Sequence, residues 1–148
     1  MTFPRPSVDI RAPPADLDDL IDWFDRVSTN LVLLEEYPRP AIRRAIDRLE
    51  RGVREHVASF DARLTEGGVP PGTLADARAI LRADHAWFSI SIEQLEWFFE
   101  IVERDDHGGH RQALGQYGRV FAEALRRHRS DERAYLGPSG TGSAGRRA

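Results

Sequence analysis

The spacing of apolar residues between positions 114 and 136 constrains the fold more than any other feature of the chain. Residues recur there at intervals of three and four, which places their side chains on one face of an α-helix. The last three positions of this face are a histidine, a glutamate and a tyrosine, where a simple bundle would carry aliphatic residues. A buried carboxylate without a partner is costly, so this face predicts a polar partner inside the protein. The face consists of Leu114, Gly118, Phe121, Leu125, His128, Glu132 and Tyr135.

Three earlier segments show the same spacing, and no segment alternates as a strand would. We therefore predict four helices at residues 16–36, 40–65, 73–104 and 110–136. Proline- and glycine-rich turns at 37–40 and 67–72, and the turn at 105–109, join them. Long helices with short connections predict an all-α fold, an up-down-up-down antiparallel four-helix bundle. The bundle is expected to span residues 15–137, after an irregular segment at 1–14 and before a disordered, low-complexity tail at 138–148.

Composition excludes several classes of function. A length of 148 residues predicts one domain. The net charge is −3 and no basic block occurs within the predicted bundle, so nucleic acid is not an expected partner. The sequence contains no apolar run of about 18 residues and no signal-peptide core, so we expect a cytoplasmic protein that does not enter a membrane. Cysteine and lysine are both absent, which removes thiolate and Schiff-base chemistry.

Three of the five histidines fall on inward faces of the predicted helices. From the rise per residue of a helix, His56, His85 and His128 lie roughly 12, 18 and 12 Å from the same end of the bundle. Together with Glu132 they are expected to form one core layer. Three imidazoles and a carboxylate are suitable ligands for iron, zinc or manganese. The alternative is that each histidine is an ordinary core residue satisfied by hydrogen bonds.

Other conspicuous residues have simpler interpretations. His107 and His110 are predicted to be solvent-facing loop residues. The three tryptophans are expected in the core or on the bundle surface rather than in a cofactor site. The arginines near the end of the fourth helix are interpreted as a solvated face rather than an anion site. The aspartates of the first helix are interpreted as surface charges, with one of them a candidate to turn inward. These charged residues are Arg126, Arg127, Arg129 and Arg133, and Asp18, Asp22 and Asp25.

These residues resemble the hemerythrin-like, HHE cation-binding family. In that family each of two helix pairs supplies an early histidine on its first helix and His-x-x-x-Glu on its second. Asp84-His85 and the later His128-x-x-x-Glu132 match the second pair, and His56 matches the first. The resemblance covers roughly residues 16–136. It implies a hemerythrin-like bundle that binds a metal ion, iron first, with dioxygen or another small molecule as a further ligand.

The resemblance is incomplete in the first half of the chain. Phe60 occupies the position where the family motif has glutamate, and the first predicted helix contains no histidine. A diiron site needs about five to seven protein ligands, and only four are present, so the pattern predicts one ion or a remnant site. Phe60 is expected to pack beside His56 and to block a second metal position. Three functions stay open: a non-haem metal protein with an oxygen, redox or metal-sensing role, a non-haem iron oxidase or oxygenase, and a metal-free helical interaction module.

Overall fold

The computed structural model of the protein describes residue 10 and residues 12–65 and 74–136. Four α-helices and one 3₁₀ turn make up this part of the chain, and it contains no strand. The prediction of an all-helical fold is confirmed. The elements are α1 (Leu17–Asn30), η1 (Leu31–Leu33), α2 (Arg39–Thr65), α3 (Leu74–Arg104) and α4 (Gly108–Leu136).

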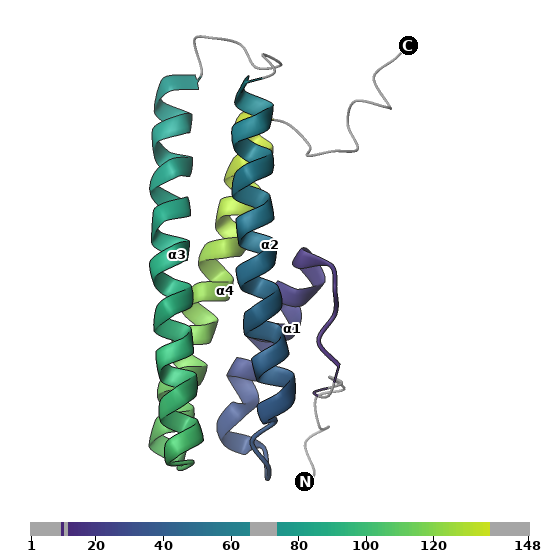
Figure 1. The fold of residues 1–148 in the computed structure, drawn as a ribbon, viewed down its shortest axis with the longest axis vertical. Helices are drawn as coiled ribbons and strands as arrows, with labels where there is room; N and C mark the ends of the chain where they lie inside the picture. The colour runs from purple at the N-terminus through teal and green to yellow at the C-terminus, as the bar shows by residue number, and fades with distance from the viewer. Residues whose placement is uncertain (1–9, 11, 66–73, 137–148) are drawn as a thin grey trace, which may run out of the picture.

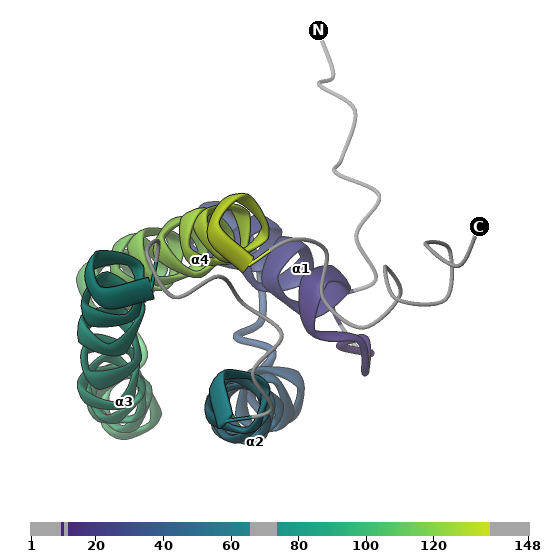
Figure 2. The same ribbon diagram turned by 90° about the horizontal axis from the view of Figure 1, so that it is seen from above.

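The helices are packed as a bundle in which each one contacts two neighbours. Helix α1 packs against α2 and α4, and α3 packs against the same two helices on the other side. Figure 2 looks along the bundle and shows this ring of four. In Figure 1 the colour advances upward along α2, downward along α3 and upward along α4, and the shorter α1 lies beside the lower half. The predicted tail at 138–148 and most of the predicted segment at 1–14 lie outside the described residues.

The first helix ends earlier than its apolar spacing predicts. Asp16 caps its start, accepting the backbone N–H of Asp19 at 3.2 Å. The α-helix stops at Asn30, η1 follows, and Leu34 is extended, whereas the prediction ran to residue 36. Arg111 of α4 explains this end, because its Nη1 donates to the backbone oxygens of Leu34 at 2.6 Å and Leu31 at 3.4 Å. Carbonyls that would otherwise be left unpaired at a helix end are thereby satisfied.

The last helix begins two residues earlier than predicted. The ring Nδ1 of His107 accepts the backbone N–H of Gly109 at 3.1 Å and of His110 at 3.4 Å. His107 therefore caps α4, a role that serine or aspartate fills more often. His110 lies in the first turn of the helix and is half-buried, so its placement in a solvent-facing loop was wrong.

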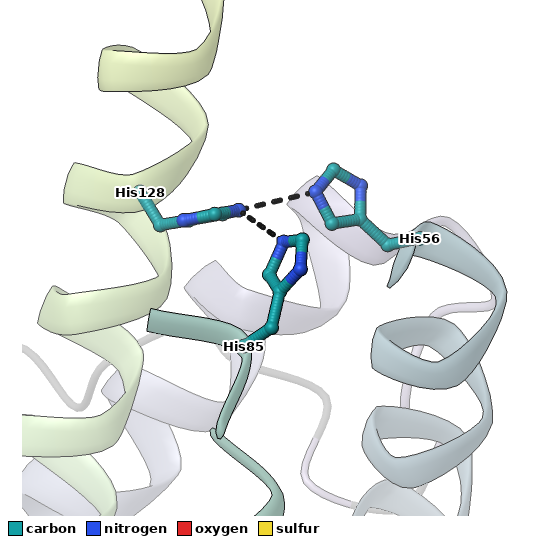
Figure 3. Close-up of side chains that lie close together, drawn as sticks. All are labelled: His56, His85 and His128. Atoms are coloured by element: carbon teal, nitrogen blue, oxygen red, sulfur yellow. Dashed lines mark hydrogen bonds between the residues drawn. The ribbon is translucent and has the colours of Figure 1, made fainter. Parts of the chain in front are cut away.

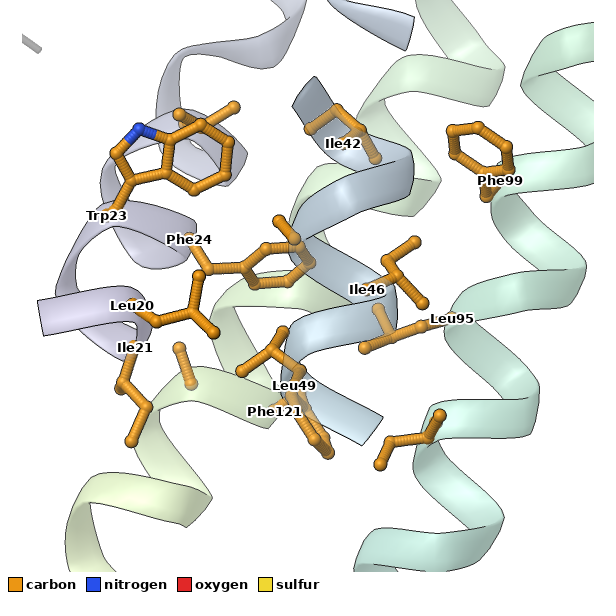
Figure 4. Close-up of a cluster of buried hydrophobic side chains, with 14 of the residues drawn as sticks. Leu20, Ile21, Trp23, Phe24, Ile42, Ile46, Leu49, Leu95, Phe99 and Phe121 are labelled. Carbon is orange, nitrogen blue, oxygen red and sulfur yellow. The ribbon is translucent and has the colours of Figure 1, made fainter. Parts of the chain in front are cut away.

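The apolar faces predicted from the sequence meet in the interior of the bundle (Figure 4). Leu17 and Leu34 are only half-buried at the ends of the α1 face, and Trp23 is buried. Trp87 and Trp97 lie on the bundle surface. The side chains of Leu64, Leu74 and Tyr135, which the predicted faces included, lie outside the described residues. Labelled core residues in the figure are Leu20, Ile21, Trp23, Phe24, Ile42, Ile46, Leu49, Leu95, Phe99 and Phe121.

Helices α1 and α4 approach each other closely at two glycines. A Cβ atom on Gly115 would lie 2.5 Å from the backbone oxygen of Ser28. A Cβ atom on Gly118 would overlap the Ser28 hydroxyl and lie 2.9 Å from the ring of Phe24. No larger residue fits this contact without a shift of one helix, so the two glycines set the α1–α4 distance. Gly118 is one of the positions on the predicted inward face of α4.

No helix in the described ranges is both long enough and apolar enough to cross a membrane.

Candidate metal centre

The structure brings His56 of α2, His85 of α3, and His128 and Glu132 of α4 together in the bundle (Figure 3 shows the three histidines). The Nε2 atom of His128 lies 3.2 Å from Nε2 of His56 and 3.2 Å from Nε2 of His85. Oε2 of Glu132 lies 2.6 Å from Nε2 of His56 and 3.5 Å from Nε2 of His128. The three histidines singled out from the sequence therefore converge, as their calculated heights allowed, and Glu132 lies against two of them.

These separations fit the geometry of ligands around one ion. Metal–nitrogen and metal–oxygen bonds of about 2.1 Å at tetrahedral to octahedral angles place ligand atoms about 3.0–3.4 Å apart. Both Nε2–Nε2 distances of 3.2 Å fall in this range. The two distances to the carboxylate oxygen, 2.6 and 3.5 Å, lie on either side of it. A small shift of the carboxylate would equalise them.

Aromatic rings enclose the cluster on two sides. The side chains of His128 and Glu132 are 1% and 4% exposed, and that of His56 is 13% exposed. Phe60 meets the ring of His85 edge to face at 4.9 Å, and Phe88 meets the ring of His128 at 5.1 Å. Phe60 lies in the core, as predicted. The prediction placed it beside His56, whereas the ring that it meets edge to face is that of His85. The two phenyl rings pack against the imidazoles and help to bury them.

Asp84 orients the central histidine. Its Oδ2 lies 2.9 Å from Nδ1 of His128. Because a carboxylate only accepts, His128 donates from Nδ1, and the lone pair of the neutral ring then lies on Nε2, which faces the cluster. A carboxylate behind a metal-binding histidine is a common supporting contact. Asp84 was assigned no role from the sequence, although it directly precedes His85. It also lies about one turn from Leu81 and from Phe88, which are both buried.

An ion-pair network reaches the cluster from α1. Arg129 forms two hydrogen bonds to Asp18, at 2.8 and 3.0 Å, and Arg133 adds a third at 3.2 Å. Nη1 of Arg129 also lies 3.4 Å from Nδ1 of His56. A guanidinium only donates, so Nδ1 of His56 accepts and its ring proton lies on Nε2, which faces Glu132.

These charged residues lie at the surface, as expected, except that Arg129 is mostly buried, and most of them form ion pairs between helices. Arg126 likewise bonds Asp22 at 2.9 Å and Asp25 at 3.2 Å. Aspartates of α1 and arginines of α4 thus pair across the helix contact. The hydrogen bond from Arg129 is the main cause of a lowered pKa at Asp18, and burial only partly opposes it. Charge pairing across two helices cannot be read from either helix alone.

The cluster also perturbs its own titrating groups. Burial raises the pKa of Glu132, but hydrogen bonds from His128 and His56 outweigh burial and leave that pKa well below the ordinary value. Burial lowers the pKa of His128, but hydrogen bonds to Glu132 and Asp84 outweigh it and raise that pKa above its ordinary value. The negative carboxylate and the histidine cation therefore stabilise each other when no other cation is present.

Two other groups in the described part of the chain bring three possible ligand atoms together. Asp105, His107 and His110 cluster at the α3–α4 turn, where His107 already uses Nδ1 to cap the helix. Asp47, Glu50 and Glu96 form an acidic group on α2 and α3. Neither is as buried as the histidine cluster, which alone combines three imidazoles with a buried carboxylate.

Helix α1 offers the cluster no histidine. The α1 carboxylate that is linked to the cluster, through Arg129, is Asp18. Asp18 is already paired with Arg129 and Arg133. Phe60 fills the position one turn after His56 with a ring that is 1% exposed. In the described part of the chain, the ligand atoms that all lie close to one another here are three histidine nitrogens, and Glu132 adds a carboxylate beside His56 and His128.

In comparisons with known proteins, no family model, no curated protein and no solved structure matches this chain.

Proposed function

We propose that this protein is a hemerythrin-like, up-down-up-down helical bundle that binds one transition-metal ion through His56, His85, His128 and Glu132. Iron is the first candidate metal, with zinc and manganese as alternatives. The observation that carries the proposal is the position of His128 Nε2, 3.2 Å from two other Nε2 atoms. A neutral ring nitrogen has one proton or one lone pair, so it cannot make good hydrogen bonds to both neighbours. A shared cation satisfies all three nitrogens at once.

The chain's own residues have distinct parts in this function. Asp84 holds His128 with its lone pair inward. His56 would bind an ion through Nε2 only after its ring proton moves to Nδ1, the side that faces Arg129. Phe60 and Phe88 restrict water. Four protein ligands complete a zinc site, whereas iron or manganese would keep positions open for dioxygen or another small molecule. An oxygen, redox or metal-sensing role follows from such an open position.

A second candidate is a non-haem iron oxidase or oxygenase on the same bundle, and one cavity favours it. A cavity of about 390 Å³ lies between α2 and α3, a size that suits a small organic molecule. Its lining is half apolar or hydroxyl and half charged, and Ser89 in this lining contacts the backbone oxygen of His85 at 3.4 Å. The lining residues are Glu50, Val53, Arg54, Val57, Ser89, Ile92, Glu93 and Glu96. The cavity is thus about one helical turn from two of the proposed ligands.

The third candidate, a metal-free core, also has a supporting observation. The short His56–Glu132 contact and the Asp84–His128 contact give imidazole N–H groups carboxylate partners without any metal. A protein in which these pairs only stabilise the fold would carry no ion.

Elemental analysis of protein purified without added metal, combined with an optical spectrum, separates these functions. The proposal expects about one transition-metal ion per chain, retained by a His107→Ala/His110→Ala variant and lost from His128→Ala. Metal that follows His107 and His110 instead would place the binding site at the α3–α4 turn. Protein that stays metal-free after incubation with iron, zinc or manganese would leave the metal-free core as the function. Turnover of an organic substrate by the iron-loaded protein would favour the oxidase.

A further inference from the structure

Helix α3 carries large apolar side chains on the face that points away from the core. Ile80, Trp87, Ile90 and Trp97 are 47%, 38%, 59% and 56% exposed. The two indoles are held against the bundle, since Trp87 stacks on Phe121 at 6.1 Å and Trp97 contacts the neighbouring ring on α3 at 5.1 Å. Fixed aromatic side chains in contact with water are typical anchors of protein interfaces.

The spacing of this face is that of a coiled coil. Its positions alternate intervals of three and four, the 3.5-residue repeat by which two helices pair along their length. The buried face of α3 runs along the opposite side, so this helix is apolar on two sides. We define the outer seam as Ile80, Ala83, Trp87, Ile90, Gln94, Trp97 and Ile101.

We propose that the outer seam of α3 pairs with the outer seam of a second copy of this chain, antiparallel and about a two-fold axis. In an antiparallel pair the two kinds of seam position face each other across the axis. One register places Ile80 against Trp97 of the second copy and Trp87 against its Ile90. Ala83, the smallest residue of the outer seam, then faces Gln94, the polar residue of the seam. All four large exposed side chains are covered in this register.

Charges beside the seam select the antiparallel direction. On the helix flank that carries Arg82 near its beginning, Glu93 and Glu100 follow further along. Antiparallel pairing brings Arg82 between Glu93 and Glu100 of the second copy. Parallel pairing would instead set this flank beside the opposite flank of the second copy, which carries Asp84 and no arginine. Glu93 and Glu100 would then have no cation across the seam.

The exposed area suits a dimer of modest size. With roughly 150–250 Å² for each large side chain, the exposed fractions leave roughly 300–500 Å² of apolar surface on one copy. Two copies contribute about twice that, and the flanking side chains add to it, which approaches the roughly 1,200 Å² of a small stable interface. The outer seam contains none of the proposed metal ligands, so this dimer does not depend on metal binding.

Sedimentation velocity over a range of concentrations tests the dimer. The wild type is expected to sediment as twice 16.7 kDa. Ile90→Glu is expected to sediment as a monomer with unchanged helical circular dichroism, whereas Leu33→Glu, at a 79% exposed position of η1, stays dimeric. A wild type that is monomeric throughout, or a dimer that survives Ile90→Glu, would overturn the proposal. Should Ile90→Glu not fold, Trp97→Gln decides the same question.

Cysteine cross-linking tests the direction and register, because the chain has no cysteine of its own. Ile80→Cys and Trp97→Cys are prepared separately and then mixed under mild oxidation. The proposed register expects a disulfide-linked dimer in the mixture and little in either variant alone. Efficient cross-linking of each variant with itself would show parallel pairing and refute the arrangement.

Discussion

If the histidine cluster binds a metal ion, the metal should stabilise the folded protein more at higher pH. This outcome is specific to the histidine cluster. Without metal, the lowered pKa of Glu132 gives stability above its ordinary value of 4.5, which is lost as the pH falls toward the folded-state pKa. The raised pKa of His128 gives stability below its ordinary value of 6.5, which is lost as the pH rises through the folded-state pKa. The metal-free protein should therefore be most stable between these two values.

Metal binding becomes tighter as the pH rises, because His128 must release its proton to bind. For one proton released, each rise of one pH unit lowers the dissociation constant about tenfold, which is about 1.4 kcal/mol. At a metal concentration about 100-fold above the dissociation constant, the folded state gains about 2.7 kcal/mol. One pH unit lower, the same concentration is about tenfold above it and the gain falls to about 1.4 kcal/mol. At about 3 °C per kcal/mol, these gains are about 8 °C and 4 °C in Tm.

Thermal unfolding followed by circular dichroism measures these gains, with and without Zn²⁺ at a fixed concentration, at about pH 5.5, 6.5 and 7.5. The protein carries His107→Ala and His110→Ala, so that the other histidine pair does not contribute. Adding His128→Ala should remove the gain at every pH. A gain that persists in that variant, or one that does not change with pH, would refute the reasoning.

Three further predictions follow from contacts around the cluster and the helix interface. Phe60→Glu should raise the metal content per chain above that of the wild type, measured by elemental analysis; an unchanged content would show that the phenyl ring does not block a second position. Asp84→Asn should weaken metal binding about 10–100-fold in a competition titration, because the amide no longer fixes the His128 proton; unchanged affinity would argue against this role. Gly115→Ala should destabilise the fold by about 1–3 kcal/mol in urea unfolding, because its Cβ would meet a backbone oxygen. Its control is Gly108→Ala, where nothing lies within 4 Å, and equal effects of the two substitutions would contradict the close contact.

Helical periodicity carried most of what the sequence could predict. The inward positions of His56, His85 and His128 followed from the spacing of their apolar neighbours. Their common level followed from the rise per residue and from neighbours that run in opposite directions. Both arguments are local or nearly so, which is why they needed no structure.

Contacts that depend on how two helices are rotated against each other were not predictable in this way. The Asp84–His128 contact and the Asp18–Arg129 pair each join positions more than 40 residues apart. Taken alone, Asp84, Asp18 and Arg129 are each typical of an ordinary surface charge. The His107 cap was not predicted, because its ring bonds the backbone N–H groups of Gly109 and His110 and histidine is an uncommon capping residue.

The glycine contact between α1 and α4 makes the two halves of the bundle unequal in stiffness. Ser28 and the two glycines leave no room for these helices to approach further, and three ion-paired arginines hold them in register. Helices α2 and α3 also pack against each other, but a cavity opens between them beside this contact. We therefore expect contraction or expansion of the histidine cluster to move His56 and His85 with their helices more readily than His128. A change at the cluster would thus reach the molecular surface along α2 and α3, as a change in the width of that cavity.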